Sequence, residues 1–298
     1  MNKTIKKLLW PLVWLRRKHD AYLVKHNPEK MFSIWHKRST GVPLNIDNPK
    51  TLDDKIAYMA FRTDTSEWTR LADKVRVREY VEECGYGEYL PKLYGTWEHT
   101  EDINFDELPD AFVIKTNNAS ATNILVRDKS KIDEAAVRKQ LDDWLKDDYG
   151  YRTCQPHYSR IKPLILAEEF LGLGGKKSLI DYKLHCVNGR PMFVQVMTDR
   201  VANTHEMKVC LKDMEWRDYP EYCSDKHQQA KDVARPGSLS QMNEMAAALA
   251  HKFPYVRVDF YEVEGKPVLG EMTFTPGFST LNMSFEEHLG QIIKMNKE

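Results

Sequence analysis

Two acidic residues near the C-terminal end of the chain have the spacing of a metal-binding hairpin. Strand-forming residues lie on both sides of a short polar break at Gly265, a pattern typical of antiparallel strands joined by a tight turn. In antiparallel pairing the numbers of paired residues sum to a constant. A turn centred on Gly265 therefore predicts that Asp259 lies opposite Glu271 and that Arg257 lies opposite Thr273.

Carboxylates that face each other require a compensating cation. Side chains opposite each other on paired strands lie about 5 Å apart at Cβ, where like charges are destabilising. Oxygen ligands suit a hard divalent ion, and Mg²⁺ commonly takes one or two carboxylates together with substrate phosphates. The same register pairs Tyr261 with Leu269 and Val263 with Pro267. Two alternatives stay open: the acids of an amphipathic hairpin face water, or a bulge shifts the register and separates them.

The residues of this hairpin resemble the metal-binding end of ATP-grasp proteins. The resemblance implies that Asp259, Glu271 and Thr273 bind Mg²⁺, with Mn²⁺ as an alternative ion; Thr273 stands where the family usually has Asn. The sequence from Arg257 to Gly277 is more similar still to the branch named after teichuronopeptide biosynthesis, found among bacterial surface-polysaccharide proteins. The implied fold is α+β, with two lobes that hold ATP between them and a helical basic arm in front.

The composition fits a folded, soluble chain and excludes several classes of protein. The 298 residues are 42% hydrophobic, which is enough for one large or two modest cores. Lys plus Arg and Asp plus Glu both number 44, so no excess of positive charge indicates nucleic acid as a partner. The five cysteines include no CxxC pair, which argues against a zinc site or disulfide framework and favours a cytoplasmic location.

We expect three parts in the chain. Residues 1–47 form the basic arm, residues 48–162 the N-terminal lobe with a phosphate-cover loop, and residues 163–298 the C-terminal lobe with the metal hairpin and a substrate loop. Residues 48–55 also resemble the polysaccharide branch, and Thr51 with Asp54 has the spacing of a loose helix-capping box. The function of this string is not readable from the sequence.

The arm carries basic residues on both sides of an apolar run at residues 8–15. The run is far shorter than the roughly 20 residues that span a bilayer, and it lacks the cleavage site of a secretory signal. Such a basic amphipathic segment, residues 3–18, can lie on an anionic membrane surface. At the inner face it would be close to a lipid-linked substrate. The alternative is a helix packed on the body of the protein.

Two lysines of the first lobe are candidates for contacting nucleotide phosphates. Lys74 follows a helix cap at Asp73, and Lys115 ends an apolar strand that precedes the polar loop 116–122. In a strand, loop and strand arrangement, backbone N–H groups can cover phosphates while a lysine supplies a compact charge. The resemblance implies that Lys74, Lys115 and Ser120 bind ATP.

The cover loop lacks the glycines that are usual in the family. Ala119, Ser120 and Ala121 stand between Lys115 and Asn123, and their side chains restrict conformations with positive φ. A stiff loop of this kind raises the alternative that ATP binds without turnover.

The strand at residues 163–171 breaks at Gly172 and resembles the hinge between the two ATP-grasp lobes. That resemblance implies that Glu168 sits beside the adenine or ribose of ATP. It also implies that the backbone at Glu169 and Leu171 forms hydrogen bonds with the adenine edge. Without the resemblance, an edge strand with exposed glutamates is the simpler interpretation.

A second hairpin is predicted around Asn188-Gly189, a strong turn signal. Alternation places Asp181, Lys183 and His185 on one face of its first strand. The resemblance implies that Lys183 contacts the nucleotide or the acyl phosphate, and we expect Asp181 to pair with it. His185 is either a general base or, more commonly, a hydrogen-bonded structural histidine.

Arg200 and Arg257 are candidates for holding a carboxylate or phosphate of the acceptor, because a guanidinium group binds such groups through two parallel hydrogen bonds. Arg200 precedes the polar segment 201–238, which we interpret as the substrate loop. Both arginines are equally consistent with structural ion pairs.

The activity that the resemblance implies is ATP-dependent carboxylate–amine ligation. A carboxylate would attack the γ-phosphate, and an amine would then displace phosphate from the acyl phosphate, with Lys183, Arg200 and Arg257 as catalytic residues. The expected substrates are a uronic acid of a bacterial surface polysaccharide, or its lipid-linked precursor, and an amino acid or amine. The alternatives are a sugar kinase on the same fold, a non-catalytic ATP-binding subunit and, less favoured because no Asp-x-Asp site is well placed, a glycosyltransferase.

Overall fold

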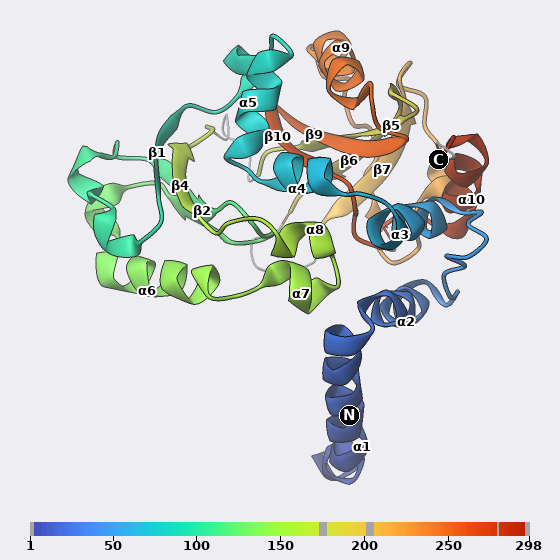
Figure 1. The fold of residues 1–298 in the computed structure, drawn as a ribbon. Coiled ribbons are helices and arrows are strands. Elements are labelled where there is room, and N and C mark those ends of the chain that lie inside the picture. The colour runs from blue at the N-terminus through green and yellow to red at the C-terminus, as the bar shows by residue number, and fades with distance from the viewer. Residues whose placement is uncertain (1–2, 173–177, 201–205, 279, 296–298) are drawn as a thin grey trace.

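Two β-sheets with surrounding helices make up the protein (Figure 1). The structure is a computed structural model that describes residues 3–172, 178–200, 206–278 and 280–295. The described α-helices are α1 (Lys3–His26), α2 (Pro28–Thr40), α3 (Leu52–Arg62), α4 (Ser66–Ala72), α5 (Arg76–Glu83), α6 (Glu134–Leu145), α7 (Tyr149–Thr153), α8 (Pro156–Ser159), α9 (Leu239–Ala250) and α10 (Met283–Ile292).

The smaller sheet is antiparallel and has the strand order β1-β4-β2-β3. Helix α6 packs against it, and Figure 1 shows this lobe at the left. Its core includes the fully buried side chains of Phe112, Ile114, Leu141 and Ile165. The strands are β1 (Leu93–Trp97), β2 (Phe112–Thr116), β3 (Asn123–Val126) and β4 (Ile165–Glu169). This lobe supplies β2 and its loop to the candidate site.

The larger sheet has the order β10-β9-β5-β6-β7-β8, antiparallel except for the short β7–β8 pair. Helix α9 packs over β5, β6 and β9. Alternate residues of β5, including Leu184 and Cys186, are buried in the core that α9 shares. Asp181, Lys183 and His185 therefore lie on the other face, as the alternation predicts. The strands are β5 (Asp181–Val187), β6 (Arg190–Thr198), β7 (Lys208–Asp213), β8 (Gln228–Gln229), β9 (Tyr255–Val263) and β10 (Lys266–Thr273).

Residues 48–55 join the N-terminal helices to α10. The predicted capping box is confirmed, because Thr51 Oγ1 accepts from Asp54 N and Asp54 Oδ2 accepts from Thr51 N. Gly290 of α10 lies against this turn so closely that a Cβ there would be 2.1 Å from Lys50 O. Lys55 Nζ donates to Ile293 O at 2.8 Å. Residues 48–55, whose function was not readable from the sequence, thus pack against α10 and the residue that follows it.

The basic arm consists of α1 and α2. Leu23, Met31 and Phe32 are buried in a cluster that includes Ala57 of α3 and Cys154 at the end of α7. Figure 1 shows the N-terminal part of α1 extending away from the body of the protein. Within the described part of the chain, no helix combines the length and apolar content that crossing a bilayer requires.

Candidate active site

The β9–β10 hairpin forms the predicted acidic pair by a different route from the predicted one. Its turn is the two-residue Glu264-Gly265, with φ of +52° and +76°, so Val263 pairs with Lys266 and Tyr261 with Val268. The expected pairs of Val263 with Pro267 and Tyr261 with Leu269 are wrong by one residue. The turn is closed by two residues in the left-handed conformation rather than centred on Gly265.

A bulge at Gly270 then restores the predicted register. The pairing shifts by one residue between Leu269 and Glu271, so that Asp259 faces Glu271 and Arg257 faces Thr273, which confirms both predicted pairs. A Cβ at Gly270 would lie 3.3 Å from Asp259 O, and glycine is the residue that fits this close approach. The bulge that we considered as a danger to the acidic pair is what creates it.

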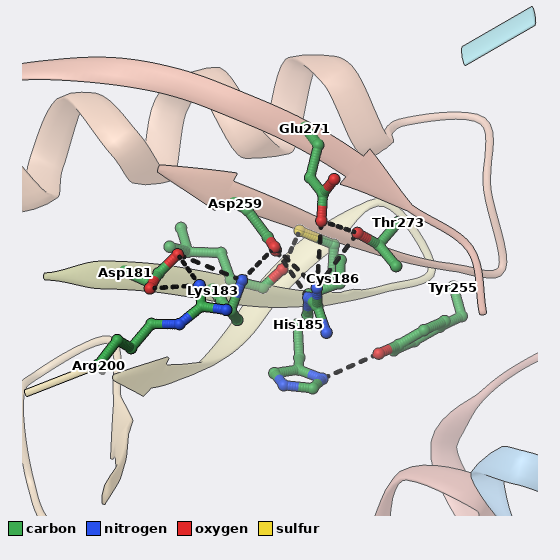
Figure 2. Close-up of polar contacts among 11 residues, drawn as sticks. Asp181, Lys183, His185, Cys186, Arg200, Tyr255, Asp259, Glu271 and Thr273 are labelled. Carbon is green, nitrogen blue, oxygen red and sulfur yellow. Dashed lines mark hydrogen bonds and ion pairs between the residues drawn. The ribbon is translucent and has the colours of Figure 1, made fainter. Parts of the chain in front are cut away.

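Asp259 is buried and is held by two cations. Arg257 Nε and Nη2 donate to its two carboxylate oxygens, each at 2.7 Å, and Lys183 Nζ donates to Oδ2 at 2.5 Å (Figure 2). Burial alone would raise the pKa of the Asp259 carboxyl. The charges and hydrogen bonds of Arg257 and Lys183 outweigh burial and hold this pKa well below its usual value.

Arg257 contacts all three residues that the sequence predicts as metal ligands. Besides its fork to Asp259, its Nη2 donates to Thr273 Oγ1 at 3.2 Å and lies 3.7 Å from Glu271 Oε1. Thr273 Oγ1 donates to the same Glu271 oxygen at 3.1 Å. The cation between the opposed acids is therefore a guanidinium group of the protein itself. It belongs to Arg257, which lies two residues before Asp259 on the same strand.

The donor set fits Mg²⁺ only in combination with phosphate oxygens. The Glu271 side chain is 36% exposed, and its contacts with Arg257 and Thr273 both use Oε1, which leaves Oε2 for a metal ion. Asp259 would have to share an oxygen with Arg257 or Lys183. Among the residues that the structure describes, no three His, Cys, Asp or Glu side chains converge on one point. Two carboxylates with nucleotide phosphates are a set that Mg²⁺ accepts.

Lys183 also links Asp259 to a second acid. Its Nζ lies 3.6 Å from Asp181 Oδ1, and Arg200 Nη1 donates to Asp181 Oδ2 at 3.1 Å. The expected pairing of Asp181 with Lys183 is confirmed. Figure 2 shows Arg200, Asp181, Lys183 and Asp259 in one row of alternating charge. Because the Arg200 side chain is 53% exposed, it has the freedom to reach another anion.

Burial and hydrogen bonds tie down the cover loop, which the lack of glycines predicts to be stiff. Residues 116–119 are buried. Asn117 donates from Nδ2 to Asp73 Oδ1 at 2.9 Å and accepts from Leu164 N at 2.7 Å. Lys74 Nζ donates to Ala119 O at 2.6 Å. Only the tip at Ser120 and Ala121 is exposed among the described loop residues, and Ala121 adopts φ +62°.

The two lysines of the first lobe lie near the acids. Lys115 forms an ion pair with Glu168 across β2 and β4. Burial is the main cause that lowers the pKa of Lys74; the charge of Lys115 adds to the lowering, while those of Glu271 and Glu168 oppose it. Lys74 is therefore within electrostatic range of Lys115, Glu168 and Glu271. The structure brings both lobes' candidates together.

The predicted adenine-binding residues lie at the end of β4. The backbone N–H of Glu169 donates to Lys92 O at 2.9 Å, and its side chain accepts from Lys92 N, so this N–H is already used within the sheet. The resemblance assigned the backbone of Glu169 and Leu171 to adenine, and the carbonyl of Glu169 and the backbone of Leu171 stay predictions. Ser120, at the exposed tip of the cover loop, is likewise a prediction.

His185 is a structural residue in this arrangement. Figure 2 shows its ring turned away from the acids toward Tyr255, whose OH lies 2.9 Å from Nδ1. Burial lowers the pKa of His185 to about 3, which keeps the ring neutral. This supports the structural interpretation over a general base.

Sequence reasoning missed the residues of α7 and α8 beside the site. Burial raises the pKa of Tyr158, and the nearby charge of Glu271 raises it further; the same two causes act on Tyr149. Gln155 accepts a hydrogen bond from Thr275 Oγ1 and so joins α8 to the segment after β10. These short helices have no periodic apolar pattern, so the sequence carried no signal for their position.

A family model described as TupA-like ATPgrasp matches residues 54–294 of this chain. The chain therefore belongs to the TupA-like ATP-grasp family, and the implied two-lobed α+β fold is confirmed. No curated protein sequence is significantly similar to the chain.

Several solved ATP-grasp structures are similar to the chain at low identity. They include D-alanine–D-alanine ligase from Bacillus anthracis complexed with ATP (14% identity, TM-score 0.41, 70% of this chain and 55% of that chain). They also include an L-amino acid ligase from Bacillus licheniformis (16% identity, TM-score 0.48, 75% and 48%). A third is the ATP-grasp ligase PsnB with its minimal precursor, Mg and ADP (10% identity, TM-score 0.37, 72% and 53%). The chain thus spans about half the length of these structures.

Proposed function

We propose that this protein is an ATP-dependent carboxylate–amine ligase that uses ATP and Mg²⁺. The observation that carries the proposal is the meeting of Asp259 and Glu271 with Lys183 and Arg257 on one sheet face, within electrostatic range of Lys74 from the other lobe. Such a set of oxygen ligands and fixed cations suits a transferring phosphoryl group.

The reaction needs no nucleophilic side chain. A substrate carboxylate attacks the γ-phosphorus of ATP, ADP leaves, and an amine then attacks the acyl carbon while phosphate departs and the amine loses a proton. Mg²⁺, held by Glu271 and Asp259 with the nucleotide, would neutralise phosphate charge. Lys74, Lys115 and Lys183 would bind phosphate oxygens, the exposed Arg200 would orient the acceptor carboxylate, and Arg257 would act from its place against Asp259 on the charge of the transferring group. We propose a uronic acid of a surface polysaccharide or its lipid-linked precursor as that acceptor.

A second candidate is an ATP-binding subunit without turnover. The tethered cover loop supports it. Asn117 ties the loop to Asp73 and Leu164, and Lys74 donates to the backbone of Ala119. A sugar kinase would use the same site but leave a stable phosphate ester.

Trapping with hydroxylamine separates these functions. The protein is incubated with Mg-ATP and a panel of uronic acids, and hydroxylamine intercepts an acyl phosphate as a hydroxamate. Hydroxamate with ADP is the expected result. ADP with a stable sugar phosphate would replace the ligase by the kinase, and tight ATP binding without ADP release across the panel would leave the binding subunit.

A further inference from the structure

The exposed apolar side chains of the protein gather on α1. Seven large apolar side chains are exposed among the residues whose exposure the structure describes, and four of them lie on this helix. Trp14 is 49% and Leu15 56% exposed. Apolar clusters of this kind on a protein surface mark contacts with a partner or a membrane. The four residues are Val13, Trp14, Leu15 and Tyr22.

The root of α1 is fixed to the protein, whereas the apolar residues at positions 13–15 are not. Leu23 is buried against α2 and α3 residues, and Arg38 donates from both terminal nitrogens to Asp20 at 2.6 and 2.9 Å. Residues 13–19 are all exposed, and this part of α1 points away from the body (Figure 1). Within residues 13–26, therefore, only the root of α1 packs on the body of the protein.

The distribution of the apolar residues around the helix favours lipid over a protein partner. Successive residues of an α-helix point about 100° apart, so Val13, Trp14 and Leu15 together cover more than half of the circumference. A partner protein that packs along such a helix covers one narrow stripe, whereas a bilayer interface contacts a helix lying in it over a broad arc. Tryptophan, with its apolar ring and polar N–H, is enriched at membrane interfaces.

The charges around the cluster identify the kind of lipid. Residues 1–19 contain six lysines and arginines and no acidic residue, although the whole chain has equal numbers of both signs. Lys18 Nζ lies 5.6 Å from the centre of the Trp14 ring, so charge and apolar surface are adjacent. In helices that bind membrane surfaces, basic residues beside the apolar residues that enter the lipid bind anionic headgroups.

We propose that α1 docks this protein on the surface of an anionic lipid bilayer. Residues 13–15 enter the boundary between headgroups and acyl chains, and Arg16 and Lys18 contact the headgroups. The proposal is independent of the ligase activity. Helix α1 contacts α7. Residues of α7 and Ser120 line a cavity of about 640 Å³. Docking through α1 would therefore bring the side of the molecule that holds this cavity toward the membrane.

Vesicle flotation of the full chain tests the docking. We expect the protein to float with phosphatidylcholine vesicles that contain phosphatidylglycerol. It should bind pure phosphatidylcholine vesicles much more weakly, and high salt should weaken its binding to the anionic vesicles. The double variants Trp14→Ser with Leu15→Ser and Arg16→Glu with Lys18→Glu should each lose about tenfold in partitioning or more. Matched controls on the body, Leu125→Ser and Arg190→Glu, change exposed residues on β3 and β6 and should float like the wild type.

Three results would overturn the proposal. The first is the absence of flotation with anionic vesicles, and the second is equal flotation of the wild type and both α1 variants. The third is sedimentation of the wild type as a dimer that Trp14→Ser with Leu15→Ser dissociates, because a second copy would then cover the cluster. Urea unfolding checks that the α1 variants keep the free energy of unfolding of the wild type, as changes at exposed positions should.

Discussion

The guanidinium group of Arg257 bonds to both carboxylate oxygens of Asp259, with two N–O distances of 2.7 Å. This relationship changes what the opposed acids do to the folded protein. A pair of uncompensated acids would destabilise the hairpin in the absence of metal. With Arg257 and Lys183 in place, Asp259 instead neutralises two cations that are themselves buried.

Asp259→Asn should therefore lower the free energy of unfolding by about 3 kcal/mol, because removing one partner leaves buried charges uncompensated. Glu271→Gln, at a partly exposed carboxylate, should change it by less than about 1 kcal/mol. Urea unfolding of both variants without metal provides the comparison. Equal stability of Asp259→Asn and wild type would contradict the neutralising role of Asp259.

The cover loop offers a second test, through a pair of alanines. Ala121 adopts φ +62°, whereas Ala119 is absent from the residues with positive φ. A left-handed conformation costs a non-glycine residue roughly 1–2 kcal/mol, so Ala121→Gly should raise the free energy of unfolding. Ala119→Gly should lower it, because glycine there only adds freedom to the unfolded chain. Stabilisation by both changes, or by neither, in urea unfolding would contradict the loop geometry.

A third test concerns the contact between α3 and α10. Burial, followed by the charge of Asp53, raises the pKa of Glu286 well above 4.5; Asp54 and His36 lie in the same group of charges. A raised pKa means that the folded state holds the proton more tightly, so stability falls as pH rises from 4.5 through the folded-state pKa.

Glu286→Gln should accordingly raise the free energy of unfolding at pH 8 and leave it unchanged at pH 4. The amide oxygen can still accept the hydrogen bond of Asp53 N, which is 3.0 Å from the carboxylate. Glu287→Gln, at the exposed neighbouring position, is the control that carries the same loss of formal charge. A destabilised Glu286→Gln at pH 8 would show that the Glu286 carboxylate is favourable.

Lys74 provides a fourth test, which separates phosphate binding from packing. Lys74→Met should weaken ATP binding by at least about tenfold, the equivalent of one lost charged contact, and leave adenosine binding unchanged. The ammonium group now bonds to Ala119 O, so the loop will also loosen. Calorimetry with both ligands checks this, and equal weakening of ATP and adenosine would count against a phosphate contact.

The sequence could predict the pairs of the metal hairpin but not how they form. Residue types located the strands, and the family resemblance located Asp259 and Glu271. The two errors in the strand pairing cancelled, because the turn is one residue shorter than the symmetric arrangement and the Gly270 bulge adds one residue. A bulge depends on packing between strands that local sequence does not specify.

The neutralising contacts and the neighbouring aromatic residues were beyond sequence reasoning. Lys183 reaches Asp259 from a strand that is 76 residues away in the chain, although its own strand face was predicted correctly. Tyr149 and Tyr158, which the charge of Glu271 affects, lie in helices too short to show a periodic pattern. Contacts between residues so far apart in the chain depend on the fold, and the spacing of residues in the sequence does not predict them.

Calorimetric titration of Mg-ATP into the wild type and Glu271→Gln tests most directly whether the acidic pair is the nucleotide–metal site. Glu271→Gln keeps the buried ion pairs of Asp259 and is the cleaner of the two acid variants. We predict that wild-type protein binds ATP more tightly with Mg²⁺ than with EDTA, and that Glu271→Gln loses this difference while staying folded. An unchanged dependence on Mg²⁺ in Glu271→Gln would contradict the assignment.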